Sequence, residues 1–114
     1  MNDCVFCKIV GGEIPAKIVY EDDLVVAFDD IEPQAPIHII IIPKRHTKNL
    51  LEAREMEDAL LARLLRAAAD IAERTGLSET GFRIISNCGR DARQSVSHLH
   101  IHMLGGKKLS AQMV

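Results

Sequence analysis

The apolar residues of this chain recur at two different spacings, and these spacings predict its helices and strands. Between about residues 52 and 75, leucine, isoleucine and alanine repeat at the spacing of one helix face. Acidic residues gather in the first half of this stretch, while Arg66 and Arg74 lie late, an order that complements the helix dipole. Gly76 follows as a C-terminal stop. The pattern therefore predicts one long helix.

Five shorter stretches have the composition of strands. Residues 17–20 and 24–28 are rich in β-branched or aromatic side chains and flank an acidic turn, which predicts a hairpin. Residues 37–42 form an apolar run that ends at a proline, the pattern of a strand buried on both faces. Two further strands are expected at 82–87 and 97–104.

The order of these elements indicates the fold class. A short first helix is expected from a cap at Asp3 through Val10, where two glycines close it. The connections between the strands do not form regular βαβ units, so we predict an α+β domain with a largely antiparallel sheet. The chain has 114 residues and neither repeats nor linkers, which predicts a single domain over residues 1–114.

Charge and composition limit the classes of partner and the cell compartment that we expect for this protein. Lys and Arg number 14 against 16 for Asp and Glu, a formal net charge of −2, so no electrostatic argument favours a nucleic-acid polymer or an anionic membrane. The longest aliphatic run, 39–42, is far too short to span a bilayer. The first residues lack the basic start and apolar stretch of a signal peptide. Three cysteines without a compartment signal are expected to be reduced, in the cytoplasm.

Three of the five histidines alternate in sequence, at His98, His100 and His102. On a strand they would share one face, while the apolar residues between them would share the other. Such a row suits an extended anion such as a phosphate chain, or two ligands of one metal. A neutral histidine is a good nucleophile toward phosphorus, and a protonated neighbour can stabilise the developing charge. The alternative, partly buried histidines bonded only to the backbone, fits an aligned trio less well.

Polar side chains near the histidines fit the same chemistry. Gln94 and Ser95 precede the predicted histidine strand and Asn87 ends the strand before it, so each can donate to phosphate oxygens. The chain has neither a Walker loop nor a GxGxxG motif, so any nucleotide is held in another way.

Residues 94–106 (QSVSHLHIHMLGG) resemble the signature of the histidine triad (HIT) family, His-φ-His-φ-His-φ-φ, where φ is apolar. Five further segments are similar in order and spacing to the Hint branch of that family: 4–9, 13–17, 20–23, 33–36 and 42–46. The resemblance implies a HIT-like fold with a five-stranded antiparallel sheet, one short helix and one long helix. It also implies a homodimer in which the two sheets join into one of ten strands.

The activity implied by the resemblance is hydrolysis of purine nucleoside 5′-phosphoramidates to an AMP-like or GMP-like monophosphate and an amine. No cofactor is needed for this catalysis in the family. By resemblance, His100 is the nucleophile that forms a nucleotidyl-histidine intermediate, His102 contacts the α-phosphate, and Ser95 is the hydroxyl near the scissile bond.

The rest of the implied substrate site lies on both sides of the chain's midpoint. Asn87 and Gln94 resemble further phosphate-side contacts, and Asp30 matches the acid that binds the ribose diol. An apolar pocket for the purine base is implied at four positions, for each of which a place in the plain core is the alternative: Phe6, Ile9, Phe28 and Ile31.

A structural zinc ion is also expected. Cys4 and Cys7 have the spacing of a metal clip, and His46 and His98 would complete a tetrahedral Cys2His2 site, as in relatives that hold zinc. Relatives that lack the cysteines fold without zinc and keep these histidines in a hydrogen-bond network, which is the alternative. The remaining histidine, His38, is expected to face a strand surface without a role.

Two departures from the family pattern bear on specificity. Arg93 stands where the family often has glycine: if the position needs a positive φ the arginine is strained, and otherwise it adds a cation beside the phosphate site. Residues 107–114 lack the tryptophan that many relatives have near the C-terminus.

Three other functions stay open at this point. One is hydrolysis of dinucleoside polyphosphates, which is the activity of the Fhit branch of the family. A second is a nucleotide-binding or zinc-dependent interaction module with little turnover. The third, a catalytic zinc enzyme with His98, His100 and His102 as ligands, leaves Cys4 and Cys7 unexplained and needs an open water position.

Overall fold

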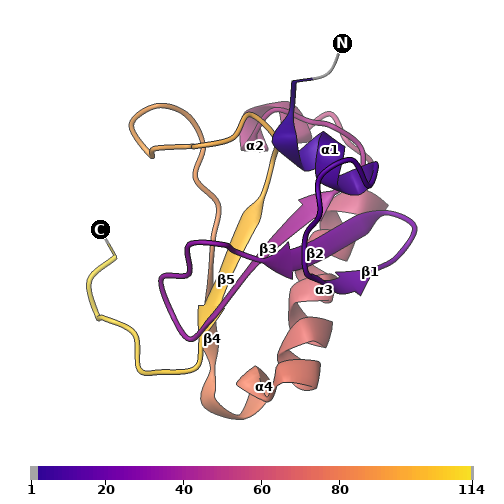
Figure 1. Ribbon diagram of the computed structural model, residues 1–114. Helices are drawn as coiled ribbons and strands as arrows, with labels where there is room; N and C mark the ends of the chain where they lie inside the picture. The colour runs from indigo at the N-terminus through magenta and orange to yellow at the C-terminus, as the bar shows by residue number, and fades with distance from the viewer. Residues whose placement is uncertain (1–2, 114) are drawn as a thin grey trace.

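The computed structural model describes residues 3–113. The helices and strands in chain order are α1 (Val5–Val10), β1 (Ile18–Glu21), β2 (Val25–Asp29), β3 (Ile37–Pro43), α2 (Leu50–Ala53), α3 (Asp58–Thr75), α4 (Leu77–Thr80), β4 (Phe82–Ile85) and β5 (Ile101–Gly105). The strands form one antiparallel sheet in the order β1-β2-β3-β5-β4 (Figure 1). The predicted α+β class and antiparallel sheet are confirmed.

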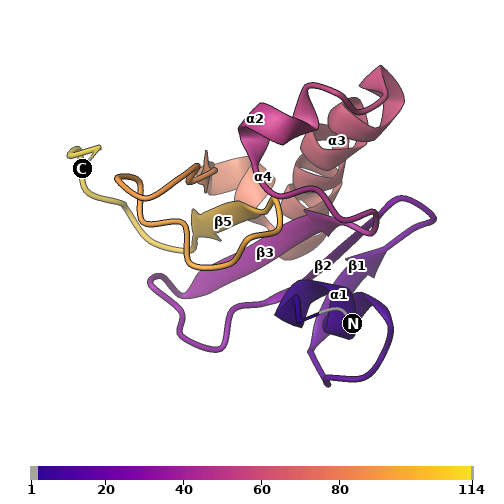
Figure 2. The same ribbon diagram turned by 90° about the horizontal axis from the view of Figure 1, so that it is seen from above.

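The two faces of the sheet are covered by different helices, with α3 on one side and α1 on the other (Figure 2). On the α3 side, Ile39 and Ile41 of β3 pack with Leu64 and Ile71 of α3 and with Met103 of β5. On the α1 side, a smaller apolar cluster gathers around α1: Phe6, Val26, Phe28, Ile40 and Ile42. Strand β3 is therefore buried on both faces, as its apolar run predicts.

The prediction of one long helix over about 52–75 is wrong in its first part. The helix is broken into α2 and α3, because the intervening chain turns Met56 into the core, where the residue is 7% exposed. The Asn49 side chain caps α2 by accepting from Glu52 N at 3.1 Å. Glu57, with extended backbone, starts α3, and Gly76 ends it at φ 81°, as the glycine signal predicts. The short α4 that follows was not anticipated by the apolar spacing.

The first helix begins one residue later than expected. Cys4, not Asp3, is its N-cap, and the Cys4 Sγ accepts from the backbone N–H of Cys7 at 3.4 Å. Gly11 closes the helix as predicted. The Cys4 sulfur takes the capping role expected of the Asp3 carboxylate, because it lies over the first turn of the helix. This cap also brings the two cysteines of the CxxC segment together.

The two C-terminal strands are shorter than predicted. β4 ends at Ile85 instead of residue 87, and β5 starts at Ile101 instead of residue 97, so His98 and His100 precede the strand. The ladder between β3 and β5 pairs Ile41 with Ile101 and stops there. Beyond it lies Pro43, which has no N–H to donate to a continued ladder.

The side chains still alternate across the shortened strand. Leu99, Ile101 and Met103 belong to the core on the α3 side, while the His98 and His100 rings contact Phe6 on the other side. The predicted division into an apolar face and a histidine face is therefore correct, although only His102 lies within β5. Among residues 3–113, no helix has the length and apolar character needed to cross a membrane.

Candidate active site and metal cluster

A cavity of about 790 Å³ opens on the α1 side of the sheet. Phe6 and Ile9 of α1 and Phe28 of β2 form apolar walls, and Ile31, 95% exposed, lies at its rim. Phe6 and Phe28 meet edge to face, with ring centroids 5.6 Å apart. The polar lining includes Asp30, His38, Ser95, His100 and His102. The structure thus places all four residues of the predicted base pocket around one cavity together with two histidines of the triad.

His100 is held in one tautomer by the backbone. Its Nδ1 lies 2.7 Å from the carbonyl oxygen of His98, so Nδ1 carries the hydrogen and donates it. The ring is 3% exposed and meets the Phe6 ring in a T-shaped contact, with centroids 5.1 Å apart. Nε2 is then the ring nitrogen with a lone pair, on a residue that lines the cavity. This is the form that nucleophilic attack requires.

His102 belongs to a hydrogen-bonded chain that reaches Asp30. The backbone N–H of Gln34 donates to His38 Nδ1 at 3.0 Å, so His38 carries its hydrogen on Nε2. That Nε2 lies 2.9 Å from His102 Nδ1 and 3.3 Å from Asp30 Oδ2. Because His102 Nδ1 accepts, its hydrogen lies on Nε2, which can donate to a phosphate oxygen.

Burial favours the neutral form of the two histidines in this hydrogen-bonded chain, His38 and His102. It lowers the pKa of His38, against the opposing effect of the Asp30 carboxylate. It also lowers the pKa of His102, with smaller contributions in the same direction from His100 and His38. Near neutral pH the pair therefore acts as a chain of directed N–H donors.

The expectation that His38 faces a strand surface is wrong, since the residue is 6% exposed and lines the cavity. It is the cavity-lining histidine that the sequence reasoning missed. A signal was present: His38 interrupts an apolar strand and shares the parity of Ile40, which pairs with His102 in the ladder.

Not every predicted phosphate contact lines the cavity. Asn87 and Gln94 lie outside the lining, and the Gln94 amide is engaged with the backbone. Its Nε2 donates to Lys48 O and Val96 O, each at 2.8 Å, and its Oε1 accepts from Gly89 N at 3.0 Å. Gln94 thereby closes the loop that leads to Ser95.

Arg93 in that loop has a positive φ of 62°. Of the two alternatives for this position, the strained one is found, since an arginine here adopts the left-handed conformation that favours glycine. Arg93 is exposed and does not line the cavity.

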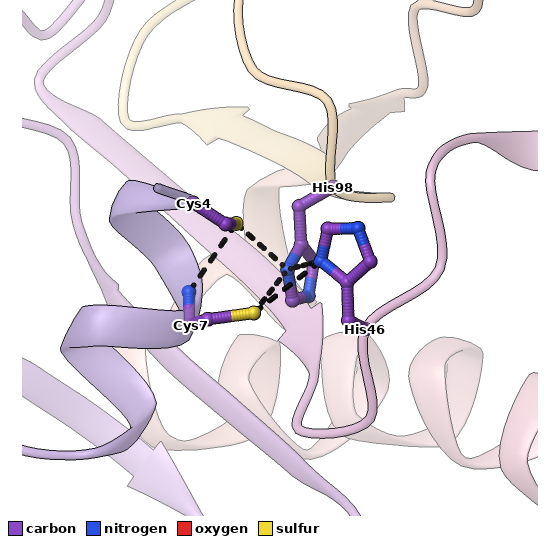
Figure 3. A group of neighbouring side chains, drawn as sticks. All are labelled: Cys4, Cys7, His46 and His98. Atoms are coloured by element: carbon purple, nitrogen blue, oxygen red, sulfur yellow. Dashed lines mark hydrogen bonds between the residues drawn. The ribbon is translucent and has the colours of Figure 1, made fainter. Parts of the chain in front are cut away.

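The four predicted metal ligands converge on one point between α1, the loop after β3 and the segment before β5 (Figure 3). Cys4 Sγ lies 3.3 Å from His98 Nδ1, and Cys7 Sγ lies 3.3 Å from His46 Nδ1 and 3.6 Å from His98 Nδ1. The two Nδ1 atoms are 3.2 Å apart. All four ligand atoms lie within 4.8 Å of one another, so the group could hold a metal ion.

These distances fit a tetrahedral zinc site. With Zn–S of about 2.3 Å and Zn–N of about 2.05 Å, tetrahedral geometry separates two nitrogens by about 3.3 Å and a nitrogen from a sulfur by about 3.6 Å. The observed separations of Nδ1 from Nδ1 and from Sγ match both values within a few tenths of an ångström. Four protein ligands would complete the coordination of such an ion, as in a structural site.

Comparison with known proteins identifies the fold. The HIT domain model matches residues 11–109, which is most of the chain. The chain belongs to the HIT family. A histidine triad protein from Clostridium difficile superposes with a TM-score of 0.94 at 46% identity, covering 98% of this chain and 97% of that one. A HIT family hydrolase from Legionella pneumophila gives 0.92 at 44% identity, covering 96% and 97%.

Two HIT sequences show the same agreement along the chain. A HIT-like protein from Synechococcus elongatus is 53% identical over 109 residues, 96% of this chain and 95% of its own. The purine nucleoside phosphoramidase of Escherichia coli is 44% identical over 112 residues, 98% of this chain and 94% of its own. The predicted family, the HIT-like fold and the enzyme class, hydrolase, are thereby confirmed.

Proposed function

We propose that this HIT protein hydrolyses purine nucleoside 5′-phosphoramidates to a nucleoside monophosphate and an amine, with His100 as the nucleophile. The observation that carries the proposal is the hydrogen bond from His100 Nδ1 to His98 O, which in the neutral ring places the lone pair on Nε2 of a residue that lines the cavity. The relative named as a purine nucleoside phosphoramidase supports the substrate class.

In the first step, His100 Nε2 attacks the α-phosphorus, and the P–N bond to the amine breaks. The amine leaves with a proton that comes from solvent through the hydroxyl of Ser95, which lines the cavity. The intermediate is a nucleotidyl-imidazolium, whose Nδ1–H donates to the His98 carbonyl. His102 Nε2–H donates to a non-bridging oxygen as negative charge develops there.

In the second step, water attacks the same phosphorus, and the bond to His100 Nε2 breaks. The monophosphate leaves, one proton passes to solvent, and His100 returns to its neutral form. Dividing the reaction in this way replaces one difficult substitution at phosphorus with two easier ones.

The nucleoside occupies the apolar part of the cavity. The edge-to-face pair of Phe6 and Phe28 forms one side of a slot that fits a purine ring, with Ile9 beside it. Asp30 lies in the polar part, where its Oδ1 already accepts from Glu32 N at 2.8 Å and Oδ2 is near His38. A carboxylate oxygen has two lone pairs, so Asp30 retains capacity for the ribose hydroxyls. Asn87 and Gln94 are proposed to support the phosphate side through the loop that they flank.

Zinc and a second subunit complete the proposed protein. Zinc bound by the Cys4–Cys7–His46–His98 cluster ties α1 to the sheet. Edge strand β4 exposes apolar side chains, Phe82, Ile84 and Ile85, and α3 exposes Leu65. Such an edge needs a cover, and pairing with a second copy would give the ten-stranded sheet of a homodimer in the cytoplasm.

The test is release of AMP from adenosine 5′-phosphoramidate by the wild type beside His100→Ala. The variant is expected to lose at least about a thousandfold in single-turnover rate while still binding AMP. A diadenosine polyphosphate offered in competition distinguishes the Fhit-type reaction. A folded wild type that binds AMP but releases none from the phosphoramidate would leave the polyphosphate hydrolase or the binding module.

A further inference from the structure

His98 takes part in two arrangements at once. Its ring belongs to the metal cluster, with Nδ1 3.3 Å from Cys4 Sγ and 3.2 Å from His46 Nδ1. Its backbone carbonyl accepts the hydrogen of His100 Nδ1 at 2.7 Å. The group that selects the tautomer of the proposed nucleophile is therefore part of the same residue that ligates the metal.

One nitrogen of the His98 ring bonds to the backbone, and the other is turned toward the metal cluster. Nε2 lies 2.9 Å from Pro43 O and donates to it, so Nδ1 has one lone pair and no hydrogen. That lone pair faces three possible metal-ligand atoms: Cys4 Sγ, Cys7 Sγ and His46 Nδ1. A single lone pair accepts one hydrogen, whereas one metal ion satisfies all four ligand atoms together. With the ion bound, all four ligand atoms would share one partner.

A second contact joins the cluster to His100. Phe6 lies between Cys4 and Cys7 in sequence, and its ring makes T-shaped contacts with both His98 and His100, at centroid distances of 5.8 and 5.1 Å. The His100 ring is thus held by the His98 carbonyl on one side and by the Phe6 ring on another. Both holding groups belong to the metal-binding segments of the chain.

We propose that the Cys4–Cys7–His46–His98 cluster is a positioning device for His100, in addition to a clamp for α1. Metal on the cluster fixes the His98 carbonyl, and that carbonyl fixes the tautomer and ring orientation of His100. The proposal rests on His100 being the nucleophile of the proposed function. Cys4, Cys7 and His46 are positioning residues, since they touch neither substrate nor the reacting atoms. Groups that orient a reacting side chain at one remove typically change rates about 10- to 100-fold.

The cluster is accessible for an experiment on the folded protein. A second cavity, of about 460 Å³, is lined by Cys4 and His46, so a chelator can reach the ion at neutral pH. Metal-free and zinc-reloaded wild type are compared with His46→Asn, in which an exposed ligand on a loop is changed without entering the core. Cys88→Ser is the matched control, since Cys88 is a thiol outside the cluster.

Three measurements, made beside the single-turnover rate of AMP release, separate positioning of His100 from general loosening of the fold. Zinc content is measured by mass spectrometry, AMP affinity by calorimetry, and the ring nitrogens of His100 by ¹⁵N NMR at fixed pH, assigned by comparison with His100→Ala. We expect one zinc per chain in the wild type and in Cys88→Ser, and loss of zinc in His46→Asn. In metal-free protein and in His46→Asn, the signal of a hydrogen-bonded His100 Nδ1–H is lost and the single-turnover rate falls about tenfold or more. AMP affinity changes less than threefold, and reloading the wild type with zinc restores both signal and rate.

Two results would overturn the proposal. The first is a wild type that binds no zinc under zinc-replete conditions. The second is a metal-free protein that keeps the His100 Nδ1–H signal, with AMP affinity lost in proportion to the rate, which would reduce the cluster to a clamp for α1. Failure of the proposed function looks different, because zinc-loaded wild type would then release no monophosphate while the metal-dependent His100 signal could still be recorded.

Discussion

Asp22, in the turn between β1 and β2, carries a charge whose contribution to stability depends on pH. Its Oδ1 accepts from Leu24 N at 2.8 Å and from Val25 N at 2.9 Å. Its Oδ2 accepts from Tyr20 Oη at 2.9 Å and lies 3.0 Å from Arg63 Nη1. Burial alone raises the pKa of Asp22, but these four donors outweigh it and lower the pKa from 3.8 to about 2.

The contribution of Asp22 to the free energy of unfolding follows from the thermodynamic linkage between proton binding and folding. A pKa lowered on folding stabilises the protein fully above the unfolded value, and the stabilisation is lost as the pH falls through the folded value. At 1.36 kcal/mol per unit, the shift of Asp22 is worth about 2 kcal/mol at pH 7 and about half of that at pH 3. The side chain is 20% exposed, so solvent screens it little. Asp22→Asn keeps an acceptor for the backbone donors and loses the charge, so it is expected to lower the free energy of unfolding by about 2 kcal/mol at pH 7.

The assay is urea unfolding followed by circular dichroism between pH 7 and pH 3, at one fixed chain and zinc concentration. Asp23→Asn is the matched control: Asp23 also faces Arg63, at 3.3 Å, but is 82% exposed. An exposed pair of this kind is worth less than about 1 kcal/mol. Equal losses in the two variants, or a loss in Asp22→Asn that does not shrink toward pH 3, would refute the assignment of the stabilisation to the shielded Asp22 charge.

Three further predictions test other parts of the structure. Arg93→Gly relieves the left-handed backbone and should raise the free energy of unfolding by up to about 1 kcal/mol in urea, whereas a loss would show an unsuspected contact. His38→Asn removes the imidazole N–H that donates to His102, and it should lower kcat about tenfold or more in steady-state assays with AMP affinity nearly unchanged. An unchanged kcat would contradict a role for the His38–His102 hydrogen bond in catalysis. Met103→Ala, at a site with no exposure, should cost about 3 kcal/mol in urea unfolding, and a cost below 1 would contradict its core role.

Much of this fold can be predicted because its signals are local. The alternation of residues 98–104 assigns Leu99, Ile101 and Met103 to the core, and the parity holds even where the ladder stops. The four ligands of the cluster and the apolar walls around Phe6 and Phe28 also follow from spacing and resemblance. Each of these features depends on residues close in sequence or on a well-defined motif.

The features that escaped prediction depend on tertiary contacts. The break before α3 arises because Met56 reaches the core, and no local helix signal reports that destination. The early end of the pairing between β3 and β5 depends on Pro43, which lies in β3 two residues beyond Ile41 of the last pair. His38 gains its role only from the cross-strand neighbourhood of His102, which needs the register of β3 against β5.

The two-sided burial of β3 has a consequence for how this scaffold can be altered. Odd-numbered residues such as Ile39 and Ile41 pack in the core on the α3 side, and even-numbered residues such as His38 and Ile40 line the cavity. Thermostability and substrate range can therefore be engineered in separate libraries, drawn from alternate positions of one strand. An insertion of a single residue in β3 would exchange the two sets and disable both at once.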